Sequence, residues 1–141
     1  MSDPNVANTV EHPTTILLLE DDTDLRETLT DGLTGAGYHV LPVTSASEAY
    51  DHTLLDQAHV AVFDLVLEHG QSTPVLLYIK MHPHYRHIKV IVMSGYDYGP
   101  QYASICGADQ FLKKPFKVSA LIAMIRALQK TEANVNTEKA P

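Results

Sequence analysis

The sequence is poor in cysteine, in basic residues and in long apolar runs. Cys106 is the only cysteine among 141 residues, which excludes an internal disulfide and favours a reducing, cytoplasmic setting. Only 10 lysines and arginines accompany 17 acidic residues, and a net charge of −7 without a basic stripe disfavours nucleic-acid binding. No apolar run approaches the roughly 20 residues that a membrane-spanning helix needs. Residues 1–12 also lack the charged and apolar segments of a signal peptide.

What the chain does contain is enough apolar sequence for one packed domain. Hydrophobic residues make up 45% of it, which is too many for a disordered chain. Residues 1–13 and 131–141 are polar and irregular. We therefore expect an N-terminal tail over 1–13, a single domain over 14–130 and a C-terminal tail over 131–141.

Short apolar runs alternate with segments of helical periodicity throughout the expected domain. We predict strands over 15–19, 38–43, 59–63, 88–93 and 110–113. We predict helices over about 24–35, 45–57, 72–81, 100–107 and 118–130. This (βα)₅ pattern predicts an α/β fold whose parallel strands are covered by helices on both faces.

Local signals refine this prediction. Pro42 cannot donate to a β-ladder, so the second strand is expected at a sheet edge. An edge position there fits the doubly wound, flavodoxin-like order 2-1-3-4-5, which opens a crevice between strands one and three. Asp24 and Glu27 are suited to a capping box for the first helix, and Ser45 and Glu48 to one for the second.

Polar residues directly follow four of the five expected strands. They are Glu20-Asp21, Asp64, Ser94 and Lys114. Because the carboxyl ends of parallel strands line one crevice, we expect these side chains to converge. Carboxylates bind Mg²⁺, Mg²⁺ and lysine neutralise phosphate, and an aspartate can accept a phosphoryl group. The set therefore predicts phosphoryl-transfer chemistry.

In this order and at these strand ends, the residues resemble the signature of the receiver domain of two-component response regulators. The matching residues are Glu20-Asp21, Asp64, Ser94 and Lys114-Pro115. The resemblance covers roughly residues 14–130. It implies reversible phosphorylation of Asp64 by a sensor histidine kinase or a histidine phosphotransfer protein. It implies no independent enzymatic turnover.

The resemblance also implies a magnesium site. Glu20, Asp21 and Asp64 would hold the ion, together with the backbone carbonyl of Val66 and water molecules. Asp22 is expected to be a structural acid, because the acidic pair of the family aligns with the two residues before it.

The remaining signature residues have catalytic roles by resemblance. Asp64 would be the nucleophile, and its attack depends on positioning and on electrostatic stabilisation of the phosphoryl group. Lys114 would pair first with Asp64 and then with the phosphoryl oxygens, while Ser94 would donate its hydroxyl to them. The peptide bond between Lys114 and Pro115 is expected to be cis.

Two other functions were weighed against this one. A phosphatase of the haloacid-dehalogenase type needs a second acid two residues after its nucleophile, and Val66 stands there. A receiver-like binding module that is no longer phosphorylated would be expected to lack one of the signature residues, and all are present.

Other motifs have simpler interpretations. The glycines between 32 and 37 end a helix and so indicate a C-cap rather than a nucleotide-binding loop. His82, His84 and His87 lie in a loop without helical i, i+4 spacing, which favours a solvated loop over a metal site.

Departures from the family pattern concern the surroundings of Asp64. Family members commonly have Met-Pro where this chain has Leu67 and Glu68, so this loop is expected to be less rigid. Val66 and Tyr96 flank the expected phosphoryl site and are poorly suited to orienting a water for hydrolysis. The phosphorylated state is therefore expected to be long-lived.

The output is expected to be a change in a protein-binding surface. No further domain is expected after residue 130, so the chain resembles a stand-alone receiver of the chemotaxis or phosphorelay kind. The switch of the family couples Ser94 to an aromatic on the fifth strand, here Phe111, which could turn inward. The alternative, that Phe111 is simply a core residue, stays open.

We expect that surface to combine the fourth helix, the fifth strand and the fifth helix. Its candidate residues are Tyr98, Tyr102, Ala123, Met124 and Ala127. Tyrosine is favoured at interfaces, and small apolar residues with one methionine suggest a downstream protein target and a possible homodimer. Alanine also favours helix in its own right, and that alternative stays open.

Overall fold

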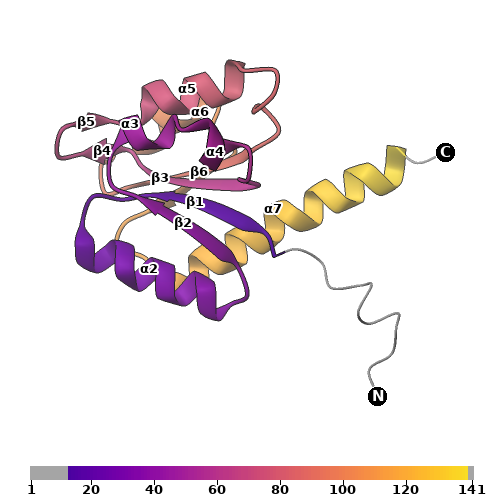
Figure 1. Ribbon diagram of the computed structural model, residues 1–141, viewed down its shortest axis with the longest axis horizontal. Coiled ribbons are helices and arrows are strands. Elements are labelled where there is room, and N and C mark those ends of the chain that lie inside the picture. The colour runs from indigo at the N-terminus through magenta and orange to yellow at the C-terminus, as the bar shows by residue number, and fades with distance from the viewer. Residues whose placement is uncertain (1–12, 140–141) are drawn as a thin grey trace.

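The computed structural model describes residues 13–139, and within them five parallel strands form one sheet (Figure 1). The strands are β1 (Thr15–Leu19), β2 (His39–Val43), β3 (Val60–Asp64), β6 (Lys89–Ser94) and β7 (Gln110–Lys113). Their order is β2-β1-β3-β6-β7, which confirms the predicted doubly wound order. β2, with Pro42, lies at an edge as predicted.

Helices cover both faces of this sheet (Figure 1). One face carries α2 (Thr23–Gly35) and α7 (Val118–Lys139). The other carries α3 (Ala46–Ala49), α4 (His52–Leu55), α5 (Thr73–Met81) and α6 (Gly99–Ile105). None of these helices is long and apolar enough to cross a membrane.

The period-2 alternation of β1 explains how one strand serves two cores. Ile16 and Leu18 pack with α2 and α7, whereas Leu17 and Leu19 pack on the opposite face. All four side chains are fully buried. A strand that is buried on both faces appears in the sequence as a continuous apolar run, which is how this one was recognised.

The second predicted helix is divided. α3 ends at Ala49, and Asp51 then caps α4 by accepting hydrogen bonds from the backbone N–H of Thr53 at 2.9 Å and its hydroxyl at 2.6 Å. A capping residue has non-helical backbone angles, so the chain cannot form one continuous helix through Asp51. The prediction of a single helix over 45–57 was therefore wrong. The described chain therefore has six helices where five were predicted.

Two helix ends also differ from expectation. Asp22, rather than Asp24, caps α2, accepting a hydrogen bond from Leu25 N–H at 2.9 Å. The structural role expected for Asp22 is therefore found. The last helix continues from Val118 to Lys139, beyond its predicted end at residue 130. Most of the expected C-terminal tail is thus helical, while residues 1–12 of the expected N-terminal tail lie outside the described residues.

The base of α7 packs closely against α2. A Cβ atom added at Gly32 would lie 2.5 Å from Cγ1 of Val118, so only glycine leaves room for this contact. Farther along α7, Leu121 and Ile125 are fully buried, as predicted for its core-facing stripe.

The amino ends of β6 and β7 are held together by a lysine and an aspartate. Lys80 Nζ lies 2.6 Å from Asp109 Oδ2 and donates to the carbonyl of Ile88 at 2.7 Å. The same carboxylate oxygen accepts the N–H of Val90 at 2.8 Å. We refer to Lys80, Asp109 and these two backbone groups as the amino-end staple.

Candidate functional site

The opposite, carboxyl end of the sheet gathers the signature residues. Glu20 and Asp21 follow β1, Asp64 ends β3, Ser94 ends β6 and Lys114 follows β7. Glu20, Asp64 and Ser94 are buried, and the Lys114 side chain is 23% exposed. The topology thus brings together residues from four separate strands, as the crevice rule predicted.

Three carboxylates form the centre of this cluster. Glu20, Asp21 and Asp64 each offer one oxygen, and the three oxygens lie within 4.8 Å of one another. Mg²⁺ binds oxygen at 2.0–2.1 Å in octahedral geometry, so oxygens at such separations suit a single ion that keeps several waters. Among the described residues, no other cluster of three or more potential metal ligands is found. In particular, the loop histidines do not form one. The donor set fits the expected ion.

Lys114 neutralises part of this charge. Its Nζ lies 3.1 Å from Asp64 Oδ2 and 3.2 Å from Glu20 Oε2. Burial alone would lower the pKa of Lys114, but the charges of Asp64 and Glu20 raise it above its ordinary value. The ammonium is therefore charged and directed at the expected nucleophile.

Glu20 is the most perturbed acid of the site. Burial, and next the charge of Asp64, raise the pKa of Glu20 from 4.5 to about 7, although Lys114 acts in the opposite direction. A single lysine does not compensate two buried carboxylates beside it. The cluster therefore has an excess of negative charge that a divalent cation would relieve.

The loop carrying the acidic pair is fixed from α2. The Arg26 guanidinium donates to the carbonyl oxygen of Glu20 at 3.0 Å and to that of Asp21 at 3.3 Å. Together with the Asp22 cap, these two hydrogen bonds from Nη1 of Arg26 restrain the backbone that carries both carboxylates. Arg26 was not among the predicted site residues.

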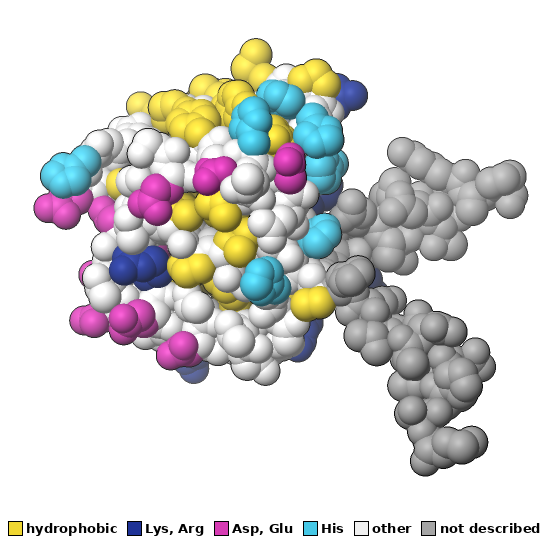
Figure 2. Space-filling view, viewed as in Figure 1, with side chains coloured by type: hydrophobic (Ala, Val, Ile, Leu, Met, Phe, Trp, Pro, Cys, Tyr) yellow, Lys and Arg dark blue, Asp and Glu magenta, His cyan; other side chains and the backbone are white. Residues whose placement is uncertain are grey.

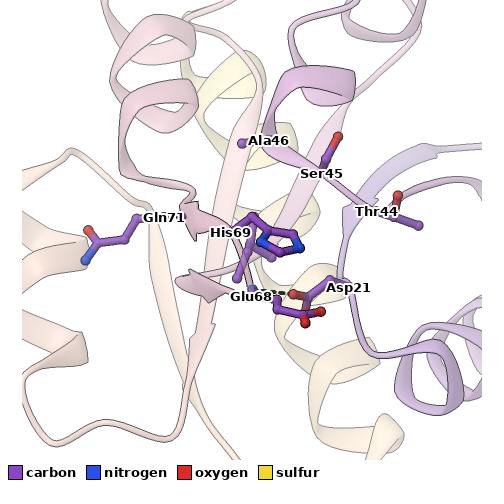
Figure 3. Close-up of a pocket in the computed structure, with 9 residues that line it drawn as sticks. Asp21, Thr44, Ser45, Ala46, Glu68, His69 and Gln71 are labelled. Carbon is purple, nitrogen blue, oxygen red and sulfur yellow. Dashed lines mark hydrogen bonds between the residues drawn. The ribbon is translucent and has the colours of Figure 1, made fainter.

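A short hairpin follows Asp64 where a loop was expected. β4 (Val66–Leu67) pairs antiparallel with β5 (Gly70–Gln71), and Gly70 adopts a φ of 142°. The N–H of Glu68, at the tip, donates to Asp21 Oδ2 (Figure 3). The loop is thus tied to one carboxylate of the acidic cluster. Two residues between short runs, followed by glycine, were the overlooked hairpin signal.

Two hollows flank the hairpin. One, of about 320 Å³, lies between the hairpin and the segment from Thr44 to Ala46 and reaches Asp21 (Figure 3). The other is the opening of the acidic cluster itself. It is lined by Asp21, Asp22, Val66, Leu67, Glu68 and Tyr96. Val66, the expected carbonyl ligand, and Tyr96, the expected flanking residue, therefore both border this opening.

The switch candidates are neighbours. The Ser94 hydroxyl accepts a hydrogen bond from Tyr96 N–H at 3.0 Å. The half-buried Phe111 ring packs at Gly99, where an added Cβ would lie 2.7 Å from the ring and 3.2 Å from Ser94 Cβ. Phe111 thus packs against the core beside Ser94, and movement of its ring stays a prediction.

The expected interface residues differ in their exposure. Tyr98 and Tyr102 are exposed, with ring centroids 5.3 Å apart, and Ala123 and Ala127 are exposed on α7. Met124 is half-buried and packs against the core on the α2 and α7 face. Met124 is therefore only partly on the outward-facing stripe that was predicted for it.

Other expected features take the places that the sequence indicated. The bond between Lys114 and Pro115 is cis. Gly37, just after α2, has a φ of 98°, in agreement with a C-cap. Several histidines gather on one side of the surface in Figure 2, whereas acidic side chains, with a further histidine beside them, lie on the side where Figure 1 places the β4–β5 hairpin.

Known proteins agree with this arrangement. A sequence profile of the response regulator receiver domain matches residues 16–126. The chain is 29% identical over 115 residues to the transcriptional regulatory protein GltR of Pseudomonas aeruginosa, covering 80% of this chain and 48% of that protein. It is 31% identical over 131 residues to the response regulator RppA of Synechocystis sp., covering 82% and 50%. The chain thus spans about half the length of these curated relatives.

Solved structures share the fold. The chemotaxis response regulator CheY4 of Vibrio cholerae superposes with a TM-score of 0.75 at 19% identity, covering 82% of this chain and 98% of that one. A CheY-like receiver domain protein of Methanospirillum hungatei gives 0.76 at 24% identity, covering 87% and 98%. The chain therefore belongs to the family of response regulator receiver domains.

Proposed function

We propose that this chain is a phosphoacceptor. Asp64 would receive a phosphoryl group, in the presence of Mg²⁺, from a sensor histidine kinase or a histidine phosphotransfer protein. The observation that carries the proposal is the convergence of three carboxylate oxygens within 4.8 Å, with Lys114 Nζ 3.1 Å from Asp64. No independent turnover is proposed.

Each residue has a role in this mechanism. Glu20, Asp21 and Asp64 would hold Mg²⁺, with the carbonyl of Val66, and the bound ion supplies positive charge for the phosphoryl oxygens. Lys114 orients the Asp64 carboxylate before transfer, and its ammonium would pair with the phosphoryl oxygens after transfer.

Ser94 completes the mechanism. Its hydroxyl would leave the N–H of Tyr96 and donate to a phosphoryl oxygen. Phe111 packs beside Ser94, which supports a coupling between the phosphorylated site and the face built from α6, β7 and α7.

Intact-mass spectrometry tests the proposal directly. Acetyl phosphate or a cognate kinase should add one phosphoryl group to the wild type only when Mg²⁺ or Mn²⁺ is present, and none to Asp64→Asn. Asp21→Ala should weaken metal binding much more than the matched Asp22→Ala, which removes only a helix cap. Equal labelling of Asp64→Asn would refute the proposal.

The output is proposed to be phosphorylation-dependent binding to a downstream protein or to a second copy of the chain. The exposed Tyr98, Tyr102, Ala123 and Ala127 support this surface. Ala123→Glu and Ala127→Glu should leave Asp64 phosphorylation intact and weaken that association, whereas Met124 would be a poor probe because it contacts the core. Sedimentation velocity with and without beryllofluoride measures self-association, and its absence in both conditions would reject the homodimer.

The single-domain arrangement and the cytoplasmic location stay predictions. The match covers only about half of each curated relative, so the mass of the protein purified from its native cells is the decisive measurement. Cell fractionation of the same material tests the location.

A further inference from the structure

Glu68 stands at the entrance to the acidic cluster. It occupies the tip of the β4–β5 hairpin, and its N–H donates to Asp21 Oδ2. Its side chain lines the same opening as Asp21, Asp22, Val66 and Tyr96. Figure 3 shows the side chains of Glu68 and Asp21 close to one another. The hairpin therefore places a further carboxylate at the edge of this opening, near Asp21.

The other carboxylates of the acidic cluster and of its opening are engaged. Glu20 and Asp64 contact Lys114, Asp21 accepts the N–H of Glu68, and Asp22 caps α2. Among the described residues, the Glu68 carboxylate takes part in no hydrogen bond or ion pair, and the side chain is exposed. A structural role therefore does not account for its charge.

The cations near the site do not neutralise that charge. Lys114 is shared between Glu20 and Asp64, and Lys113 pairs with Asp97 at 2.8 Å. The Arg26 guanidinium is bonded to the carbonyls of the acidic loop. The rim of the opening, which includes Asp21, Asp22 and Glu68, therefore carries an excess of negative charge.

We propose that Glu68 is a specificity-determining residue, whose charge discriminates between the cations and the anionic phosphodonors that enter this opening. Its carboxylate raises the affinity for a divalent cation and slows phosphorylation by small dianionic phosphodonors. The inference rests on the proposed function. In water at moderate ionic strength, one charge several ångströms from a divalent ion changes its affinity roughly threefold.

Acetyl phosphate is the probe for the donor half of this inference. Asp64 forms a new O–P bond, the P–O bond to the acetyl group breaks, and acetate leaves with the bonding electrons. The donor approaches as a dianion, so repulsion by Glu68 raises the barrier to encounter. Removing this one charge should increase the second-order rate constant at saturating Mg²⁺ roughly threefold at low salt.

Glu68→Gln keeps the backbone N–H that holds Asp21 and removes only the charge. Asp31→Asn is the matched control, because it removes one exposed negative charge two turns along α2. Calorimetric titration should show roughly threefold weaker Mg²⁺ binding for Glu68→Gln and unchanged binding for Asp31→Asn. Glu68→Lys should enlarge both effects, and about 0.5 M salt should shrink them.

The outcomes separate the inference from the function on which it rests. If wild type binds Mg²⁺ and is phosphorylated, but Glu68→Gln matches it in both measurements, the inference is overturned. A change in only one measurement overturns the half concerning the other. If wild type neither binds Mg²⁺ nor accepts a phosphoryl group, the proposed function itself has failed. Equal thermal unfolding of wild type and Glu68→Gln would confirm that the hairpin is intact.

Discussion

Two lysines lie at opposite ends of the same sheet, and their surroundings differ in charge balance. Lys80, at the amino end, faces one carboxylate, and that carboxylate also accepts a backbone N–H. Lys114, at the carboxyl end, faces two carboxylates, with Asp21 beside them. The side chains of Lys80 and Lys114 are similarly accessible, 16% and 23% exposed.

The difference teaches how a structural ion pair can be told from a reactive site. The amino-end staple pairs one ammonium with one carboxylate, and each also bonds a backbone group, so its charges balance without a ligand. The site keeps more negative charge than its lysine neutralises. Burial, and next the charge of Asp64, therefore raise the pKa of Glu20 to about 7. Uncompensated charge, rather than the presence of a buried pair, indicates function.

The largest expected effect concerns Lys114. Lys114→Met should slow the Mg²⁺-dependent phosphorylation of Asp64 by about 100-fold, because the phosphoryl charge loses a positioned partner. Rates from acetyl phosphate, followed by intact mass, provide the measurement. Lys80→Met is the matched control and should retain the wild-type rate. Equal slowing in both variants would break the distinction between the two lysines.

The second effect concerns stability at the amino end. Lys80→Met leaves Asp109 without its cation and should reduce the free energy of unfolding by about 2 kcal/mol, since partial exposure softens the loss. Urea denaturation at neutral pH measures it. Lys117→Met, at an exposed position before α7, should stay near wild type. A loss below about 0.5 kcal/mol for Lys80→Met would mean that the staple is merely a surface pair.

The third effect concerns the lifetime of the phosphorylated state. Val66 and Tyr96 border the opening, and neither is suited to holding a hydrolytic water. Introducing Val66→Asn together with Tyr96→Glu should speed hydrolysis about tenfold, equivalent to about 1.4 kcal/mol of barrier. The decay of phosphoprotein after donor removal tests this. Unchanged or slower decay in the double variant would reject the explanation.

The last expected effect is a pH dependence limited to the carboxyl end. The folded-state pKa of Glu20, about 7, lies above its ordinary 4.5, so its protonation favours the folded state. This contribution is fully present below about pH 4.5 and disappears as pH rises through about 7. The metal-free protein should therefore lose thermal stability from this group between about pH 4.5 and pH 7.

Glu20→Gln isolates that contribution. The histidines titrate in the same range, so the informative quantity is the difference between the two melting profiles rather than either profile alone. Mg²⁺ should reverse the trend for wild type, because the ion competes with the proton on Glu20. Parallel profiles for wild type and Glu20→Gln without metal would contradict the assignment.

Much of the fold could be predicted from the sequence, because its signals are local. The continuous apolar run of β1 and the edge proline of β2 were sufficient to predict the strand order, since parallel connections allow few alternatives. The division into α3 and α4 was missed. Asp51 can stand within a helix or cap one, and the local sequence does not distinguish these two roles.

The residues of the candidate site could be predicted from the sequence, but their burial, contacts and pKa values could not. The residues that end strands could be identified because the carboxyl ends of the strands meet in one crevice. The raised pKa of Glu20 and the contact of Arg26 with the acidic loop depend on burial and on three-dimensional distances, so the sequence contained no direct signal for them. The hairpin of Glu68 was missed because its strands are only two residues long.

The length of α7 carries its last turns beyond the sheet. At about 1.5 Å per residue, the 22 residues from Val118 to Lys139 extend over roughly 33 Å, and Figure 1 shows this helix reaching past the sheet. The helix is held to the domain as far as Gln129, which bonds Thr14 and Tyr38. A bend of about 10° beyond Gln129 would displace Lys139, roughly 15 Å farther along, by about 3 Å. Such a bend would leave the buried contacts of Leu121 and Ile125 unchanged while moving a surface that another molecule can contact.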